Sequence, residues 1–455
     1  MRKYAHARLI SKRKKMKPTA LHSGKLFPSL CLLIVLFFAG EGYPQETFAK
    51  KIIGGGSPIA VVQSADGGYV SVSTDVRSTY VGSTFLVRKT TGSGTRAWER
   101  QVSFTTTDRI HIAAIAQTTD GGYVIVGSDK FLIDFFFSEG IVVKLSPGGN
   151  ILWARSFRKG MGPNPSVEFT SVSDTPDTGF IVTGRDCLAA DDIFDCSIFG
   201  TILVTFNSAG AVLSAKSFGK LAPKSGFGLR NLLINLQIVS AADSGFFAAV
   251  DNGNGASVIK VDDLGNILWR ELLEIDHFLF STLAATSNGG VIFAGRCGGA
   301  GCVIKLKGNG QIEWKKRFAF DVRIQSISDV TQTSDGGYLV TGTTRNGFLF
   351  KVDSSGKAVF GRQFANAISD FIFSTADGGF FLFGTRISDM LLWKLKSDGT
   401  NDCTLSDSPK FKSIPFGNVN IEVPQFDSTN LFFQGSTHLD VNSAPSKKQV
   451  STACP

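Results

Sequence analysis

Residues 333–342 read TSDGGYLVTG, with Asp335-Gly-Gly placed between two stretches in which apolar and polar residues alternate. Asp-Gly or Asn-Gly in such a position is the strongest short-range signal of a β-hairpin, because the turn needs a positive φ that glycine adopts at little cost. The signature recurs at steps of 42 to 66 residues. Its seven copies begin at Asp66, Asp120, Asp177, Asp243, Asn288, Asp335 and Asp377. The repetition predicts one structural unit built seven times.

A second signature follows the first and predicts another hairpin in the same unit. Residues 141–157 read IVVKLSPGGNILWARSF, and residues 257–273, 302–318 and 348–364 repeat this strand–turn–strand pattern. Each unit then has four short strands, A to D, with an A–B turn at the first signature and a C–D turn at the second. Four strands in each repeat of about 50 residues predict an all-β fold, a seven-bladed β-propeller of four-stranded blades.

The sequence also predicts how the ring of blades is closed. The D strand carries an aromatic residue or a substitute at one position, and only six such positions follow the A–B turns: Trp98, Trp153, Ser214, Trp269, Trp314 and Phe360. Near the N-terminus, Phe48-Ala-Lys-Lys-Ile52 has the spacing and character of Trp314-Lys-Lys-Arg-Phe318. We predict that residues 47–53 complete the last blade, which joins the two ends of the ring and removes an open sheet edge.

The combined pattern, T-x-D-G-G-Y with a β run ending in Gly and then V-x-K-L-D-x-x-G-x-I-x-W, resembles the repeats of secreted bacterial propeller-like proteins. The best matches are Thr333–Gly342 with Phe348–Phe364, and Thr118–Gly127 with Ile141–Phe157. The resemblance covers residues 47–403 and departs most in the third repeat, which has Thr178 for Gly and Ser214 for Trp. It implies the propeller fold. These proteins are mostly uncharacterised, so it brings no catalytic residues with it.

The first 42 residues have the layout of a secretory signal. Residues 1–25 hold nine Lys or Arg and no acid, and the apolar run Leu26–Gly40 is shorter than the roughly 20 residues of a membrane span. Gly40 and Gly42 occupy the −3 and −1 positions of a cut after Gly42. Met16 is an alternative start, and an uncleaved N-terminal anchor is an alternative outcome. We expect a secreted, periplasmic or cell-surface protein.

The net charge of the whole chain comes mainly from this predicted export signal. The 455 residues include 47 Lys+Arg and 38 Asp+Glu, a formal charge of +9, which usually indicates nucleic acid or an anionic membrane as a partner. Nine of the bases and one acid, Glu41, lie in residues 1–42, which leaves 38 basic and 37 acidic residues in the mature chain. With a net charge of +1, we expect no nucleic-acid partner. No other segment is apolar for long enough to span a membrane, so we expect no membrane span in the mature chain. We expect the mature chain to be a monomer.

Cysteine usage agrees with an oxidising compartment. Six of the seven cysteines lie beyond the signal, and their spacing favours three local bridges among 15 possible pairings. The expected pairs are Cys187–Cys196, Cys297–Cys302 and Cys403–Cys454. The last pair flanks residues 404–455, a tail without the repeat signature. We expect this tail to be either an ordered cap on the propeller domain (43–403) or a loosely attached extension.

Binding is expected on the face that holds the B–C loops and the D–A connections, because the turns of the other face are short and uniform. The variable segments on this face are 128–140, 158–165, 185–200 and 219–231. Arginine opens the B–C loop in four blades, at Arg185, Arg296, Arg345 and Arg386. These four form either a cationic collar for an anionic polymer, a glycan carboxylate or an acidic protein patch, or a set of ordinary surface arginines. The apolar segment 131–137, with Phe135, Phe136 and Phe137, is either a partner contact or a buried strand.

Signatures of catalysis and of metal binding are missing from the sequence. Beyond the signal the only histidines are His111, His277 and His438, and none falls in a nucleophile–base pattern. There is no CxxC pair, and the repeated Asp-Gly-Gly is better explained by turn formation than by calcium. We expect no cofactor and no metal.

The sequence therefore favours a non-enzymatic interaction or scaffold module that presents variable loops to a protein or glycan of the cell envelope. One alternative is a propeller enzyme that acts on polysaccharide through carboxylates at the channel mouth, for which two carboxyl groups roughly 5–9 Å apart would be the sign. The other alternative is an envelope structural protein without a specific ligand.

Overall fold

The structure is a computed structural model that describes most of residues 47–401 and seven short strands of the tail. The described ranges are 47–53, 55–74, 84–104, 109–130, 138–159, 166–177, 179–192, 195–218, 236–251, 255–275, 277–320, 322–364, 367–387, 389–401, 406–407, 412–414, 419–422, 429–430, 433–438, 441–445 and 450–452. The chain divides into two units, Met1–Pro44 and Gln45–Pro455, and every described element belongs to the second. The predicted signal lies outside the described residues. Within the described ranges, no helix has the length and apolar character needed to cross a membrane.

The first 28 strands fall into seven antiparallel groups of four, which we call blades 1 to 7. Blade 1 holds β2 (Pro58–Gln63), β3 (Tyr69–Thr74), β4 (Thr84–Thr90) and β5 (Arg96–Phe104). Blade 2 holds β6 (Arg109–Gln117), β7 (Tyr123–Lys130), β8 (Ser138–Leu145) and β9 (Ile151–Lys159). Blade 3 holds β10 (Val167–Asp174), β11 (Phe180–Asp192), β12 (Asp195–Phe206) and β13 (Val212–Ser217).

The remaining blades repeat this plan. Blade 4 holds β14 (Leu236–Ser240), β15 (Phe246–Asp251), β16 (Gly255–Val261) and β17 (Ile267–Ile275). Blade 5 holds β18 (Phe278–Ala285), β19 (Val291–Cys297), β20 (Ala300–Leu306) and β21 (Ile312–Ala319). Blade 6 holds β22 (Ser326–Gln332), β23 (Tyr338–Thr343), β24 (Gly347–Val352) and β25 (Ala358–Phe364). Blade 7 holds β26 (Ile368–Ser374), β27 (Phe380–Arg386), β28 (Asp389–Leu395) and β1 (Phe48–Ile52).

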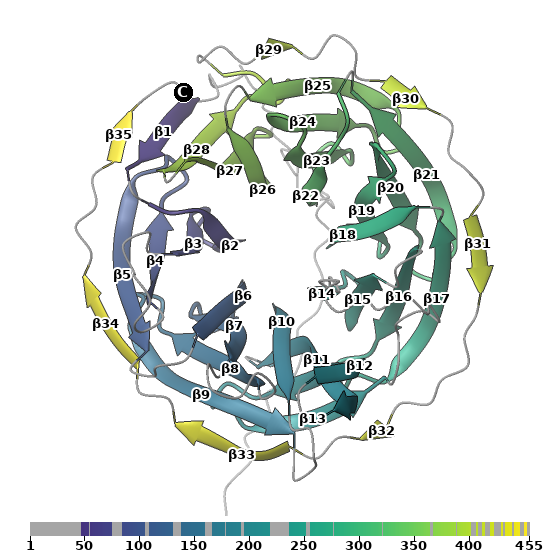
Figure 1. Cartoon of the computed structure of the whole chain (residues 1–455). Coiled ribbons are helices and arrows are strands. Elements are labelled where there is room, and N and C mark those ends of the chain that lie inside the picture. Colours follow the sequence, from purple (N-terminus) through teal and green to yellow (C-terminus); the bar gives the residue numbers. More distant parts are fainter. Residues whose placement is uncertain are drawn as a thin grey trace, which may run out of the picture. The chain divides into compact units, whose positions relative to one another are not determined.

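The blades stand around a ring, with their A strands innermost and their D strands at the rim (Figure 1). The hydrophobic core lies mainly between successive blades: one cluster joins Val72 and Phe85 of blade 1 to Ile125 and Val143 of blade 2. The blades remain separate sheets, apart from a single parallel bridge between Gly255 and Leu279 that links blades 4 and 5. Four-stranded antiparallel sheets in this arrangement make a β-propeller, so the predicted all-β propeller fold is confirmed.

The last blade takes its outer strand from the N-terminus, as predicted. Strand β1 pairs antiparallel with β28, with Phe48 opposite Lys394 and Ile52 opposite Met390. Phe48 also fills the position that tryptophan holds in other D strands, because a Cβ added at Gly94 of blade 1 would lie 2.6 Å from its ring. The first described strand therefore joins blade 7 to blade 1.

The C-terminal tail runs around the rim and adds a fifth strand to every blade, a feature that the sequence did not predict. Its strands, which we call the belt, are β29 (Ser406–Asp407), β30 (Lys412–Ile414), β31 (Val419–Glu422), β32 (Thr429–Asn430), β33 (Phe433–His438), β34 (Val441–Pro445) and β35 (Val450–Thr452). They pair in order with the D strands of blades 6, 5, 4, 3, 2, 1 and 7. The belt thus passes every blade in the reverse order of the chain (Figure 1). It covers the D-strand edges, which would otherwise be open to pairing with other chains.

The two repeated signatures meet inside each blade through a lysine of the C strand. The lysine ammonium group contacts the aspartate of the A–B turn in five blades: Lys89 with Asp66, Lys144 with Asp120, Lys260 with Asp243, Lys351 with Asp335 and Lys394 with Asp377. Blade 5 has Asn288 in the turn, and there Lys305 contacts Glu313 at 2.6 Å. Blade 3 has Thr205 in place of the lysine. The lysine and the turn acid therefore form one structural pair.

The D-strand tryptophans connect each blade to the next. The indole nitrogen of Trp314 in blade 5 donates to the carbonyl oxygen of Ser354 in the C–D turn of blade 6 at 2.9 Å. Trp269 makes the same bond to Gly308, at 2.7 Å. The turn glycine beneath the ring has a positive φ, 78° at Gly356, and a Cβ there would lie 3.0 Å from Trp314. In blade 3, where Ser214 replaces the tryptophan, Leu203 lies against Gly265 of the next blade instead.

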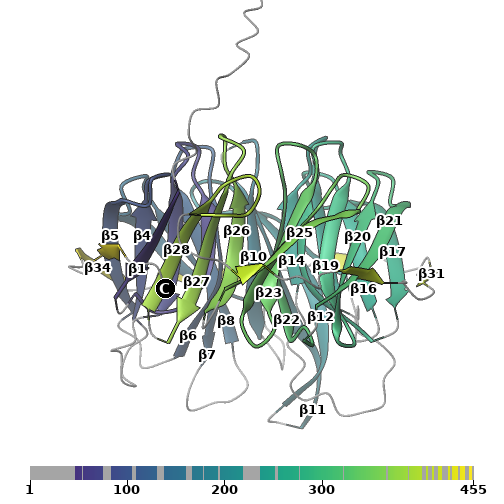
Figure 2. The same cartoon turned by 90° about the horizontal axis from the view of Figure 1, so that it is seen from above.

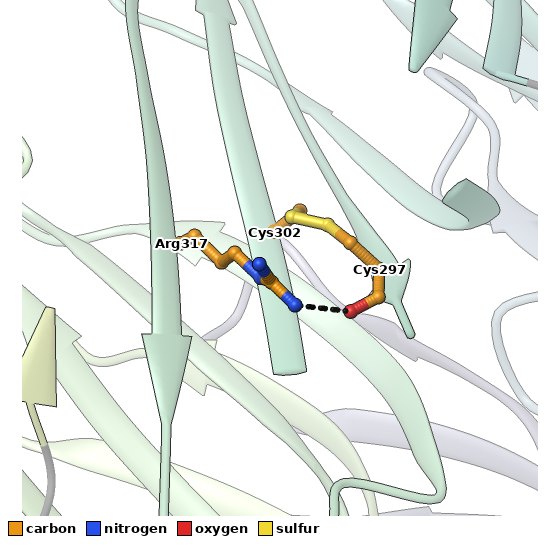
Figure 3. Close-up of a disulfide and its surroundings, with 3 residues drawn as sticks. All are labelled: Cys297, Cys302 and Arg317. Atoms are coloured by element: carbon orange, nitrogen blue, oxygen red, sulfur yellow. Dashed lines mark hydrogen bonds between the residues drawn. A yellow bond between two sulfur atoms is a disulfide. The ribbon is translucent and has the colours of Figure 1, made fainter. Parts of the chain in front are cut away.

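One predicted disulfide is fully described. Cys297 and Cys302 are bonded across the tight turn between β19 and β20, with their Cα atoms 5.9 Å apart, and Arg317 of β21 donates to the Cys297 carbonyl oxygen at 3.3 Å (Figure 3). Cys187 is also disulfide-bonded. Its predicted partner, Cys196, belongs to the adjacent strand β12, but its side chain lies outside the described residues. Cys403 and Cys454 lie outside them as well.

Candidate functional site

The two faces of the ring differ in regularity. On the face of the A–B and C–D turns, which we call the turn face, the N–H of the first turn residue donates to the carbonyl oxygen four residues later in all fourteen turns, as Ser64 does to Gly68. Each of these turns thus satisfies its own backbone. The other face holds the B–C and D–A connections, and we call it the loop face. Its connections differ from blade to blade, so it is the face on which one part of the ring differs chemically from another.

The loop face has a side with long connections and a side with short ones. Nine residues separate β3 from β4, seven separate β7 from β8, and eighteen separate β13 from β14. By contrast, two residues join β19 to β20, three join β23 to β24, and two join β27 to β28. Long connections therefore gather on blades 1 to 3, while blades 5 to 7 end in tight turns.

Residues 185–200, predicted as a loop, are an extension of strands β11 and β12. The two strands stay paired from Arg185 opposite Thr201 out to Asp192 opposite Asp195, with three irregularities in register. Figure 2 shows this hairpin projecting beyond the other strands on the loop face. The loop prediction was wrong here because cross-strand pairing satisfies the backbone polar groups of this segment, as a loop of this length would not.

Three of the four predicted arginines lie at the short-turn side. Arg345 is exposed, and Arg296 and Arg386 are partly exposed. Arg185 differs, because its Nε and Nη2 contact Glu168 Oε2 of the neighbouring strand at 2.8 and 2.6 Å. The structure therefore brings three of the four to one side of the face, with Arg185 in an ion pair of blade 3. Their role in binding stays a prediction, and Phe135, Phe136 and Phe137 lie outside the described residues.

A series of hydrogen bonds links the inner strands of blades 3 to 7, and the sequence analysis missed it. The Ile238 N–H donates to Ser171 Oγ, the Leu283 N–H to Gln237 Oε1, and the Ile372 N–H to Asp329 Oδ2. Each acceptor belongs to the A strand of one blade and each donor to that of the next. The sequence signal was a polar residue recurring at one A-strand position, directly before an apolar one: Ser171, Gln237, Thr282 and Asp329.

Two carboxyl groups of the inner strands have raised pKa values. Burial raises the pKa of Asp329 to about 7, although hydrogen bonds from the Ile372 and Val330 N–H groups and from Thr282 Oγ1 oppose the change. Burial likewise raises the pKa of Asp370 to about 6, against a hydrogen bond from Thr385 Oγ1 at 3.0 Å. Raised pKa values are found in general acids, but they also occur where a carboxyl group serves the fold. Since both Asp329 oxygens accept bonds that join blades 5, 6 and 7, the structural role explains this residue directly.

In the described part of the chain, no group of three or more His, Cys, Asp or Glu side chains is placed to hold a metal ion. The turn aspartates are instead occupied. Asp335 accepts from the Gly337 N–H at 3.1 Å and from Lys351 at 2.5 Å, and the Thr333 hydroxyl also donates to it. The turn reading of Asp-Gly-Gly is thereby supported.

Comparison with known proteins identifies no family for this chain, and the solved structures that it resembles are 10–14% identical to it. No family model matches, and no curated protein matches. The virginiamycin B lyase of Staphylococcus aureus is 10% identical, with a TM-score of 0.49 over 77% of this chain and 100% of that one. The Dos1 propeller is 10% identical, with a TM-score of 0.46 over 77% and 95%. A Bacteroides caccae protein of unknown function is 14% identical, with a TM-score of 0.39 over 70% and 94%.

Proposed function

We propose that this chain is an exported, non-enzymatic interaction module: a seven-bladed propeller, closed by its N-terminal strand, that presents the loop face to a protein or glycan of the cell envelope. The observation that carries the proposal is the contrast between the faces. Fourteen turns on one face satisfy themselves with the same backbone bond, whereas the connections on the other face vary from two residues to eighteen. Variable connections on a rigid frame are where binding residues are usually found.

The disulfide chemistry supports the export part of the proposal. Cys297–Cys302 and the bonded Cys187 need an oxidising compartment to form and persist. The N-terminal segment, with a basic stretch followed by an apolar one, resembles a secretory signal and also supports export. Both features support the proposal that the mature chain begins after Gly42 and works outside the cytoplasm.

The test is binding by the mature chain to a glycan array and to solubilised envelope proteins, in variants that alter one face at a time. A variant with Arg296→Ser, Arg345→Ser and Arg386→Ser changes the loop face. A variant with Lys307→Ser and Lys357→Ser removes cations from the turn face. Binding that the first variant weakens and the second retains supports the proposal. Binding that depends only on the turn face would contradict it, and binding to nothing would favour an envelope structural protein.

The raised pKa of Asp370 favours a second candidate, an enzyme that acts on polysaccharide through carboxyl groups of the inner strands. Its test is release of reducing sugar from a panel of bacterial polysaccharides by the mature chain. Release that Asp370→Asn abolishes, with unchanged thermal stability, would establish the enzyme over the binding module.

A further inference from the structure

A strained residue stands at the loop-face end of blade 7. Ile387 begins the two-residue turn between β27 and β28, has a φ of 58°, and is 94% exposed. A β-branched residue in this region of φ is an outlier, because its side chain crowds the backbone. The corresponding turn of blade 5 begins with Gly298, whose φ is 60° and which has no side chain to crowd. Glycine is therefore the residue that the fold itself favours here.

The strain at Ile387 brings no gain inside the molecule. A side chain that is 94% exposed removes almost no apolar surface from water. Strain of this kind is found where a residue serves a purpose other than stability. A side chain that strains the turn and stays almost fully exposed adds little to the stability of the fold, and a contact made outside the molecule would explain it.

Two further isoleucines extend the exposed apolar surface along the same blade. Ile368 is 45% exposed and opens the inner strand β26, opposite Thr385, which is two residues before Ile387. Ile53 is 49% exposed and follows Ile52, which lies opposite Met390 at the outer edge of the blade. We call Ile53, Ile368 and Ile387 the isoleucine edge. Since neighbouring strands are about 4.8 Å apart, the edge runs across the four strands of blade 7 from the inner strand to the rim.

Arginines accompany this edge. Arg386 directly precedes Ile387, and the turn that holds Arg345 lies beside Ile368, because the Gly347 N–H donates to the Ala367 carbonyl oxygen at 2.5 Å. Neither arginine forms an ion pair with any described residue. The nearby acids are engaged within the blade: Asp389 with Lys51 at 3.3 Å, and Asp370 with the Thr385 hydroxyl at 3.0 Å. The surface therefore combines exposed apolar side chains with positive charge.

This chemistry selects a polypeptide over a sugar. Sugar rings stack on exposed aromatic side chains, and among the described residues the large exposed hydrophobic side chains are Ile, Leu and Val only. An aliphatic edge beside arginines is complementary to a protein segment in which carboxylates flank an apolar side chain. We propose that the isoleucine edge, with Arg345 and Arg386, is the docking site for such an acidic and apolar segment of a partner protein. This inference rests on the proposed function and names the class of its ligand.

The experiment selects peptides from a displayed library of short random sequences with the immobilised mature chain, and measures their affinity for the wild type and three variants. We expect the selected peptides to carry Asp or Glu beside Ile, Leu or Phe. Ile387→Gly should weaken them by about tenfold or more, as expected when the contact of a buried aliphatic side chain is lost. Its melting temperature should not fall, because glycine relieves the strained φ. Arg345→Ser with Arg386→Ser should also weaken binding and make it less sensitive to salt.

The matched control is Leu264→Ser, which removes a 63% exposed aliphatic side chain from the turn face and should leave binding unchanged. Equal binding to wild type and Ile387→Gly, selected peptides without acidic residues, or no selected peptide at all would each overturn the inference. So would Ile387-dependent binding to vesicles of phosphatidylglycerol, which would identify a membrane surface instead. Ligands lost in the arginine variant but kept by Ile387→Gly would refute the inference and leave the proposed function standing. Ligands that depend only on the turn face would refute both.

Discussion

The ammonium group of Lys351 lies 2.5 Å from Asp335 Oδ2 and so joins the two signatures that repeat along the chain. The lysine is buried in the C strand, whereas the aspartate stands in the A–B turn with more than half of its side chain exposed. The hydrogen bond from Lys351 and the bonds from Thr333 and Gly337 hold the pKa of Asp335 down to about 2, although its partial burial acts in the opposite direction. The lysine of V-x-K-L and the aspartate of D-G-G thus recur together because the buried ammonium group and the turn carboxylate neutralise and hydrogen-bond each other.

Replacing Lys351 with Met should lower the free energy of unfolding by about 1 kcal/mol, toward the low end for a charged hydrogen bond because Asp335 is largely exposed. The variant should also lose less stability in acid. In the wild type the folded pKa of about 2 lies below the ordinary 3.8, so the contribution of Asp335 is present above pH 3.8 and is lost as pH falls toward 2.

Urea unfolding of both proteins between pH 2 and 7 measures this effect. Lys307→Met, which changes an exposed lysine of the preceding blade, is the control and should match the wild type. Identical acid profiles for wild type and Lys351→Met would show that the pair does not contribute to stability.

Asp329 should give the opposite pH dependence. Burial raises its folded pKa to about 7, well above the ordinary 3.8. Between those values the folded state binds a proton that the unfolded chain does not, so stability should rise as pH falls from 7 to 4. Asp329→Asn removes the titration, and its stability should change less over this interval, whatever the cost of the substitution itself. The control is Asp353→Asn in an exposed C–D turn, which should keep the wild-type slope. If Asp329→Asn also kept that slope, Asp329 would not be its source.

Alanine substitutions at two glycines of blade 6 should distinguish the energetic cost of backbone strain from the cost of a packing clash. Gly336 and Gly356 have φ values of 80° and 78°, but a Cβ at Gly336 would have only Ser354 Cβ, 4.0 Å away, whereas one at Gly356 would lie 3.0 Å from Trp314. Gly336→Ala should cost only the strained φ, about 1–2 kcal/mol. Gly356→Ala should cost about 1–3 kcal/mol more, since the indole ring of the preceding blade must move. Thermal unfolding compares the two, and equal losses would mean that the tryptophan contact is not tight.

The sequence predicted the repeating parts of this fold because one local rule generates each of them. Asp-Gly-Gly with alternating residues specifies a hairpin, and Phe48 could be matched to Trp314 because both fill the same space above a turn glycine. The belt could not be found in this way. Its strands are two to six residues long, and their pairing depends on the exposed edges of other blades and not on a pattern of their own.

The candidate site was predicted only in part, for a related reason. The arginines could be assigned to a face, since a four-stranded meander fixes which connections share it. The ion pair of Arg185 with Glu168 depends on the bulge that sets the register of β10 and β11, which no local signal announced. Ile387 was missed because its φ, not its identity, makes it unusual.

Removing the N-terminal strand should open the ring. Strand β1 pairs with β28 on one side and with β35 on the other, so a chain that lacks residues 43–53 leaves two strands without their shared partner. We expect this deletion to lower the melting temperature of the mature chain and to promote association through the exposed edge. Size-exclusion chromatography and thermal unfolding test both effects. A melting temperature equal to that of the full mature chain would contradict the closure.

The same strand order leads to the last prediction, which concerns the ends of the belt. The belt leaves the ring after Asn401, at the C–D turn of blade 7, and returns at Thr452, which lies opposite Lys50 in the same blade. Cys403 follows the first of these residues by two positions and Cys454 follows the second by two. We propose that the two cysteines bond, as their spacing predicted, and close the belt into a covalent loop around the propeller. Closing a loop of about 50 residues contributes about 4 kcal/mol in the chain-entropy model.

A non-reduced digest of the mature protein should contain the linked peptide. Cys454→Ser should unfold faster and at lower denaturant than the wild type, whereas Cys302→Ser, which opens a short loop, should have the smaller effect. The comparison must be made without reductant, because reduction should make the stability of the wild type equal to that of Cys454→Ser. Free thiols at positions 403 and 454 in the exported protein would show that the belt is held by strand pairing alone.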